Sequence, residues 1–184
     1  MTFGEHQDAE LDDTDRGILT MLQEDCRAAL ARIGEHVGLS APSVLERIKK
    51  LEAAGVITGY HATLDARRLG FDVTAFIGVI TSHPNLIATI ERQLVALNGV
   101  LECHHVTGEY TLLLKVKTAN TSSLEELITA IRSLDGVTRT ETTVVLSTHA
   151  ESVQLALDPD QHQPATHGKR ARRAADRNGH LRRA

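Results

Sequence analysis

The chain has 184 residues, a net charge of −4 and an apolar fraction of 41%, which suits one or two domains with a packed core. With no Trp and only 3% aromatic residues, that core is expected to be aliphatic. The acidic N-terminus lacks an apolar run and no window could span a bilayer, so we expect a cytoplasmic protein without a secretory signal or a membrane segment.

Apolar residues at helical spacing predict a first helix over residues 11–25. Asp12 or Asp13 can accept hydrogen bonds from the first N–H groups of this helix and so cap it. A second helix is predicted over residues 29–37, where the apolar residues share one face. Gly38 follows directly and can supply a left-handed C-cap.

A third helix is predicted to start at Ser40, a good N-cap, and to tolerate Pro42 in its first turn. The connection to the second helix has only three residues, so the two helices cross steeply, as in a helix-turn-helix. We therefore expect an N-terminal arm of residues 1–10 and a helix-turn-helix domain of residues 11–57. The inner face of the third helix is predicted to comprise Ala41, Val44, Leu45, Ile48 and Leu51.

The polar side of the third helix carries residue types that contact DNA when a helix enters the major groove. Arg47 is predicted to read a base, because its guanidinium group can donate two hydrogen bonds to O6 and N7 of guanine. Lys49 and Lys50 are predicted to contact phosphates. Ser40 and Ser43 lie at the start of the helix, where base edges would come close. The alternative is an ordinary solvated face of a core helix.

Residues 58–71 follow the third helix and predict a wing and a linker strand. The stretch VITGYHATLD has strand character with a glycine at the bend. A short strand in this position would make the N-terminal domain a winged helix-turn-helix.

From residue 72 onward, strand-like apolar runs and amphipathic helices follow the order β-α-β-β-α-β. That order is the ferredoxin-like motif, a four-stranded antiparallel sheet with both helices on one face, and we assign it to residues 72–149. The whole chain is then α+β. Its predicted strands are 72–81, 101–106, 110–117 and 138–148, and its predicted helices are 86–97 and 123–134.

The strand over residues 72–81 is apolar on both faces, whereas a sheet with one face in water would need apolar residues on the other face only. Helices cover only one face, so a second copy of the chain is the expected cover for the other. We therefore predict a homodimer. Its interface is assigned to the face that carries Val73, Ala75, Ile77 and Val79, which alternates with Phe76 and Ile80.

Residues 150–184 are predicted to form a basic tail, disordered over residues 158–184, because they show no apolar periodicity. Residues 169–184 hold seven Lys and Arg and one Asp, a net charge of +6, which leaves −10 for the rest of the chain. An acidic body does not by itself attract DNA. Any DNA-binding function therefore needs local positive charge or several binding domains acting together.

The stretch CHH at residues 103–105 invites a metal or catalytic interpretation, but in a strand Cys103 and His105 share one face and His104 takes the other, so the three side chains do not converge. We therefore predict neither a metal ligand nor a catalytic residue there. Cys26 and Cys103 are expected to be buried reduced thiols, since free cysteines are usually core residues. The turn TGEYT after this strand could be a simple hairpin, in which Gly108 meets the need for positive φ.

Three stretches together resemble the Lrp/AsnC family of feast/famine transcriptional regulators: LDDTDRGILTMLQEDCR, VGLSAPSVLERIKKLEAAGVITGYHATLD and ECHHVTGEYTLLLKV. The resemblance covers about residues 11–149. It implies a winged helix-turn-helix that binds double-stranded DNA and a ferredoxin-like domain that oligomerises and binds a small effector, usually an amino acid. It also implies dimers that assemble into octamers or similar discs, and no cofactor.

The resemblance places the effector at the turn formed by Thr107, Gly108, Glu109, Tyr110 and Thr111. Members of the family with an amino-acid effector often have Asp where this chain has Thr111. The loss of that carboxylate removes one possible partner for an effector's amino group.

Two other functions stay open at this point. The basic tail and the missing Asp favour a DNA-organising protein that has no small effector. Proteins similar to this family also act as sirohaem decarboxylases, which use His and Arg near a tetrapyrrole, and His104 and His105 keep that enzyme alternative open.

Overall fold

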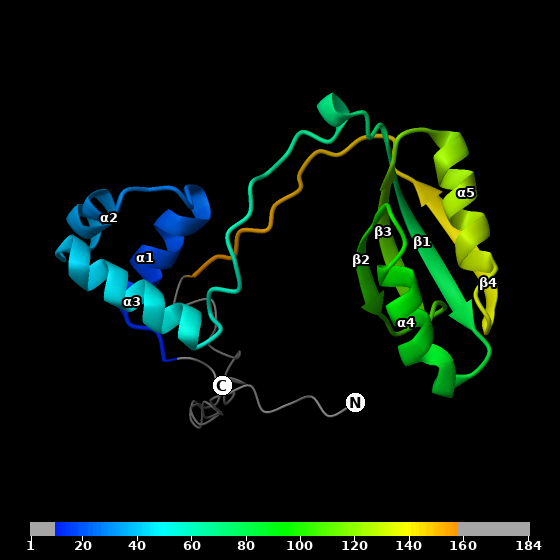
Figure 1. The fold of residues 1–184 in the computed structure, drawn as a ribbon, viewed down its shortest axis with the longest axis horizontal. Coiled ribbons are helices and arrows are strands. Elements are labelled where there is room, and N and C mark those ends of the chain that lie inside the picture. Colours follow the sequence, from blue (N-terminus) through cyan, green and yellow to red (C-terminus); the bar gives the residue numbers. More distant parts are fainter. Residues whose placement is uncertain (1–9, 158–184) are drawn as a thin grey trace, which may run out of the picture. The chain divides into compact units, whose positions relative to one another are not determined.

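The computed structural model describes residues 10–157, drawn in colour in Figure 1. These residues form two compact units. Residues 10–61 and 153–157 belong to the first, and residues 62–152 belong to the second. The predicted arm, apart from Glu10, and the predicted disordered tail of residues 158–184 lie outside the described residues.

The first unit contains three helices, α1 (Asp13–Glu24), α2 (Leu30–Val37) and α3 (Ala41–Ala53). Each begins or ends at a predicted cap. Asp12 accepts a 2.7 Å hydrogen bond from the N–H of Asp15, Gly38 ends α2 with φ 72°, and Ser40 caps α3. The longest of them, α3, has 13 residues, and no helix within residues 10–157 has the length and apolarity that a bilayer span requires.

The core of the first unit lies between the three helices and is aliphatic. Ile18, Ile33, Val44 and Ile48 form its buried centre. The prediction that Leu45 belongs to this inner face is wrong, because its side chain is 39% exposed. Leu45 lies about 100° around the helix from Val44, on the side away from the core.

The predicted wing is not formed. Between α3 and the second unit's first strand, the described chain contains one 3-10 turn, Arg67–Leu69, and no strand. A strand needs a partner for its backbone N–H and C=O groups, and no described strand pairs with residues 58–71. The strand-like composition of VITGYHATLD therefore does not produce a strand within this single chain.

The second unit is a four-stranded antiparallel sheet in the order β2-β3-β1-β4, with two helices (Figure 1). The β-α-β-β-α-β order predicted from sequence is confirmed. A 3-10 turn, Pro84–Leu86, leads into the first helix. The elements are β1 (Val73–Thr81), α4 (Ile87–Val95), β2 (Val100–His105), β3 (Leu112–Thr118), α5 (Thr121–Arg132) and β4 (Val137–Val144).

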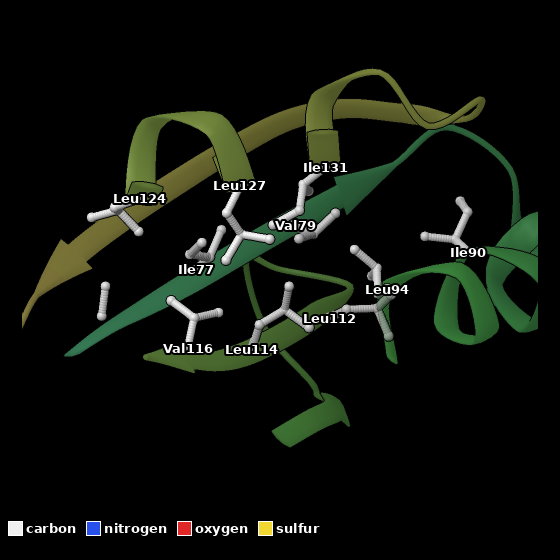
Figure 2. Close-up of a cluster of buried hydrophobic side chains, with 11 residues drawn as sticks. Ile77, Val79, Ile90, Leu94, Leu112, Leu114, Val116, Leu124, Leu127 and Ile131 are labelled. Carbon is white, nitrogen blue, oxygen red and sulfur yellow. The ribbon is translucent and has the colours of Figure 1, made fainter. Parts of the chain in front are cut away.

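Helices α4 and α5 cover one face of the sheet, and Figure 2 shows the side chains that pack there. Ala75, Ile77 and Val79 of β1 are fully buried among them. They lie beside the other buried side chains of the cluster, which are Ile90, Leu94, Leu112, Leu114, Val116, Leu124, Leu127 and Ile131.

The predicted dimer face is therefore wrong, because Ala75, Ile77 and Val79, with the partly buried Val73, pack against this chain's own helices. Alternation along a strand defines two faces but does not say which one the helices cover. The face left open carries the alternating residues Phe76 and Ile80 instead. We call it the open sheet face; besides those two it carries Thr74, Gly78, Leu113, Lys115 and Lys117.

Candidate nucleic-acid interface and effector site

The exposed side of α3 brings together most of the residues predicted to contact DNA. Lys49 and Lys50 are exposed, and no ion pair joins either of them to another described residue. At the start of the helix, the hydroxyls of Ser40 and Ser43 lie 2.9 Å apart, because Ser40 also caps the Ser43 N–H. Two hydroxyls and two unpaired ammonium groups thus lie along one helix.

Arg47 does not lie free on that exposed side. Its Nη1 donates a 2.6 Å hydrogen bond to Asp12 and a 2.8 Å hydrogen bond to Asp15. The side chain of Asp15 is only 13% exposed, whereas that of Asp12 is 53% exposed. We call this three-residue arrangement the Arg47 clasp. It joins the middle of α3 to the first turn of α1.

The Arg47 clasp changes the charges that the domain presents. The Asp15 backbone N–H, followed by the Arg47 side chain, lowers the pKa of the Asp12 carboxyl. The hydrogen bonds to Asp12 and then Asp15 raise the pKa of Arg47. The guanidinium of Arg47 is therefore matched to carboxylates of this chain rather than presented to solvent. Sequence analysis missed Asp12 and Asp15 as partners, although their spacing at the start of α1 is a capping signal.

The end of α3 is tied to the segment that follows it. The Tyr60 hydroxyl donates a 2.9 Å hydrogen bond to the Glu52 carboxylate. Burial first, and then this hydrogen bond, raise the pKa of Tyr60 to about 12. Glu52 therefore has a neutral hydroxyl donor beside it over the whole physiological pH range.

The predicted effector residues lie on one turn but do not converge on one point. Thr107, Gly108 and Glu109 are exposed at the tip, and Gly108 has φ 115°. Thr111 extends the pairing of β1 with β3 through a 2.9 Å hydrogen bond from its N–H to the carbonyl of Val79. Its hydroxyl accepts a 3.3 Å hydrogen bond from the Thr81 N–H.

Tyr110 lies over the open sheet face rather than at the tip of the turn. A Cβ atom on Gly78 would come within 2.5 Å of the Tyr110 ring, so the glycine leaves the space that the ring occupies. Burial first, and then a hydrogen bond with Glu141, raise the pKa of Tyr110. The turn is thus fastened to the sheet by its aromatic residue, and within residues 107–111 Glu109 offers an exposed carboxylate.

Three cavities of the second unit lie where β1 begins, away from this turn. Their volumes are about 390, 360 and 420 Å³, and residues 107–111 line none of them. None of these three cavities therefore brings a ligand against the turn.

The stretch at residues 103–105 is divided between the two faces of the sheet. Cys103 packs against the core, where burial first, and then the charge of Glu91, raise its pKa. His104 lies 3.2 Å from a carboxylate oxygen of Glu102. Among residues 10–157, no group of three His, Cys, Asp or Glu side chains is placed to hold a metal ion. The expectation that Cys26 is buried is wrong, since it is exposed.

Comparison with known proteins covers both units. A model of the AsnC-type helix-turn-helix domain matches residues 11–52, and a model of the Lrp/AsnC ligand binding domain matches residues 74–155. The HTH-type transcriptional regulator FL11 of Pyrococcus abyssi is 35% identical over 147 residues, which are 80% of this chain and 97% of that protein.

Two similar solved structures contain a bound amino acid. The transcriptional regulator NMB0573 of Neisseria meningitidis, in complex with L-Met, has a TM-score of 0.77 at 29% identity, over 80% of this chain and 97% of that one. The feast or famine regulatory protein Rv3291c of M. tuberculosis, complexed with L-methionine, has a TM-score of 0.74 at 32% identity, over 79% of this chain and 98% of that one.

Proposed function

Since this chain belongs to the Lrp/AsnC family of transcriptional regulators, we propose that it binds double-stranded DNA through the exposed side of α3 and responds to an amino acid. The observation that carries the DNA-binding part is the capped three-helix unit with two unpaired lysines on α3. A regulator of transcription works where the chromosome lies, so we also propose that the protein is cytoplasmic.

The proposed DNA contacts differ in kind. Ser40 and Ser43, at the start of α3, lie where a helix in the major groove meets base edges, and Lys49 and Lys50 contact phosphates. We do not propose Arg47 as a residue that reads a base, because Arg47 would have to break two short ion pairs, with Asp12 and Asp15, to reach the DNA. The lysines alone supply little charge, so the affinity comes from several such units on one DNA.

Replacing the two lysines tests the interface. We expect Lys49→Ala and Lys50→Ala to weaken binding to every duplex alike, because phosphates carry no sequence information. Each lost phosphate contact reduces the slope of log K against log salt by about 0.9. Fluorescence anisotropy titrations at several salt concentrations measure both effects, with a duplex selected from a random pool and a scrambled one. Arg132→Ala, an exposed cation of α5, is the control. Unchanged slopes for both lysine variants would exclude α3 as the interface.

The amino-acid part of the proposal is supported by the two L-methionine complexes of relatives. We place the effector against residues 107–111, with Glu109 as the partner of its ammonium group and a second copy completing the site. Thr111 offers no carboxylate and its hydroxyl already bonds to Thr81. That occupied hydroxyl favours the second candidate function, a DNA-organising protein without a small effector.

Thermal denaturation with each of the twenty amino acids separates these two functions. A ligand at 100 times its Kd stabilises the folded state by about 2.7 kcal/mol, which raises Tm by several degrees. We expect such a rise for at least one amino acid, with L-methionine tested first, and a smaller rise in Glu109→Gln. Glu126→Gln, an exposed acid of α5, is the matched control. A uniform absence of stabilisation would favour the DNA-organising function.

We further propose a homodimer that assembles into an octamer or a similar disc, with the open sheet face as its first interface. Phe76 is 38% exposed there, and Ile80 and Leu113 are half-buried beside it.

We propose no catalytic activity, because the relatives are named as regulators. When a tetrapyrrole is added to the purified protein, the absorbance spectrum is therefore expected to equal the sum of the spectra of the free tetrapyrrole and of the protein.

A further inference from the structure

The segment that follows β4 turns back across the open sheet face. Its first residue, Val145, still extends the sheet, because its N–H donates a 2.9 Å hydrogen bond to a carbonyl of β1. At the other end of the segment, the Glu151 carboxylate forms ion pairs with Lys115 and Lys117 of β3. In the strand order β2-β3-β1-β4, β3 lies on the far side of β1 from β4. Residues 145–151 therefore cross over β1, and we call them the strap.

A cavity of about 360 Å³ lies between the strap and the sheet. The sheet contributes Thr74, Phe76 and Lys115 to the lining of this cavity, and the strap contributes residues 145 and 147–151. All three sheet residues belong to the open sheet face, so the strap lies on that face and not on the one that α4 and α5 cover. A second copy of the chain that covers this end of the open sheet face therefore contacts the strap as well.

Glu151 is the counter-ion of two lysines that are largely shielded from water. The side chains of Lys115 and Lys117 are 16% and 23% exposed. Lys115 has a second carboxylate, that of Glu102, at 3.0 Å. Lys117 lies 3.5 Å from Glu151, and no other carboxylate among residues 10–157 forms an ion pair with it. A hydrogen bond to Glu151, followed by one to Glu102, raises the pKa of Lys115.

The charges of the open sheet face balance only when the strap is included. The register of the strands shows which charged residues share this face with Phe76 and Ile80. They are three cations and two carboxylates: Lys115, Lys117, Arg139, Glu102 and Glu141. With histidine counted as neutral, the strands therefore carry a net charge of +1 on this face. The carboxylate of Glu151 brings that charge to zero.

This balance matters because the proposed partner is an identical chain. A two-fold dimer places the same face on both sides of its interface, so any net charge on the face is opposed by the same charge. Two faces of +1 repel each other, and the removal of water from between them strengthens the repulsion. Without Glu151, Lys117 would also be buried in the interface without a partner, which is unfavourable.

We propose that the strap is part of the assembly surface, and that Glu151 neutralises the open sheet face so that two copies of this face can pack together. The inference rests on the proposed homodimer. It extends the interface beyond the four strands, to a residue that lies outside the sheet and after β4. The partner's surface is the same one, the open sheet face together with its own strap.

Charge substitutions at Glu151 and Lys117 test the proposal. Each single substitution, Glu151→Gln or Lys117→Gln, leaves a net charge on the face, whereas the double variant restores zero. We expect each single variant to raise the Kd for self-association roughly tenfold or more at about 50 mM NaCl, and the double variant to recover most of this loss. The loss should shrink at about 1 M NaCl, where screening acts over about 3 Å. Sedimentation velocity over a dilution series measures these constants.

Glu125→Gln, which removes an exposed acid of α5, is the matched control and is expected to assemble as the unchanged protein does. Circular dichroism checks that every variant is folded. The proposal is overturned if Glu151→Gln assembles as tightly as this control, or if the double variant is as weak as Glu151→Gln, since charge balance would then have no effect. An unchanged protein that stays monomeric would instead contradict the proposed homodimer, and this inference with it.

Discussion

Arg47→Ala is expected to destabilise the DNA-binding unit and to weaken its binding to all DNA sequences in the same proportion. The substitution leaves Asp15, whose side chain is 13% exposed, without its cation. A largely buried carboxylate that has lost its cation costs on the order of 1–3 kcal/mol, which lowers Tm by about 5–15 °C for a small domain. If Arg47 read a base, the variant would instead keep its Tm and lose its preference for one base at one position of the DNA site.

The measurement for Arg47→Ala is a melting curve together with titrations against a selected and a scrambled duplex. The double variant Arg47→Ala with Asp15→Asn is expected to recover part of the lost Tm, because the uncompensated charge is gone. Lys50→Ala controls for loss of a cation on the same helix. A variant with unchanged Tm that loses only its preference for the selected duplex would show that Arg47 reads a base.

Acid should affect the Arg47 clasp in a defined direction. The pKa of Asp12 is lower in the folded protein than its ordinary value of 3.8. Its contribution to stability is therefore complete above pH 3.8 and is lost as pH falls through the lower folded pKa. The difference in stability between the unchanged protein and Asp12→Asn should accordingly shrink below pH 4 and stay constant above it.

Phe76→Asp is expected to convert the assembled protein into monomers and to reduce DNA affinity by two orders of magnitude or more. Phe76 is 38% exposed at the centre of the open sheet face, between Lys115 on β3 and Thr143 on β4. A carboxylate there would lie in the proposed interface without a partner. Linked binding domains gain roughly 10²- to 10⁴-fold in avidity, and monomers lose that gain.

Sedimentation or light scattering at micromolar concentration measures the change in mass, and circular dichroism checks that the fold remains. Phe71→Asp is the matched control, since Phe71 is 45% exposed and precedes β1. It should stay assembled. A Phe76→Asp protein with the mass of the unchanged protein would exclude the open sheet face, and a monomeric unchanged protein would exclude the proposed assembly altogether.

Sequence reasoning located most of the elements because their signals are local. Asp12, Gly38 and Ser40 cap helices through bonds to residues no more than four or five positions away. The order of strands and helices in residues 73–144 is likewise indicated by a local signal, the spacing at which apolar residues recur along the chain. The residues expected on α3 and on the turn 107–111 were found at those places for this reason.

The sequence by itself therefore determined the helix-turn-helix, the order of the ferredoxin-like unit and the family resemblance. Only the tertiary structure decided which face of β1 the helices cover, because Val73–Thr81 carries apolar residues on both sides. The carboxylate partners of Arg47 and Lys117 were also decided there, since each lies in a distant part of the sequence. Pairing between distant polar groups depends on where packing brings two elements together, and no local pattern records that.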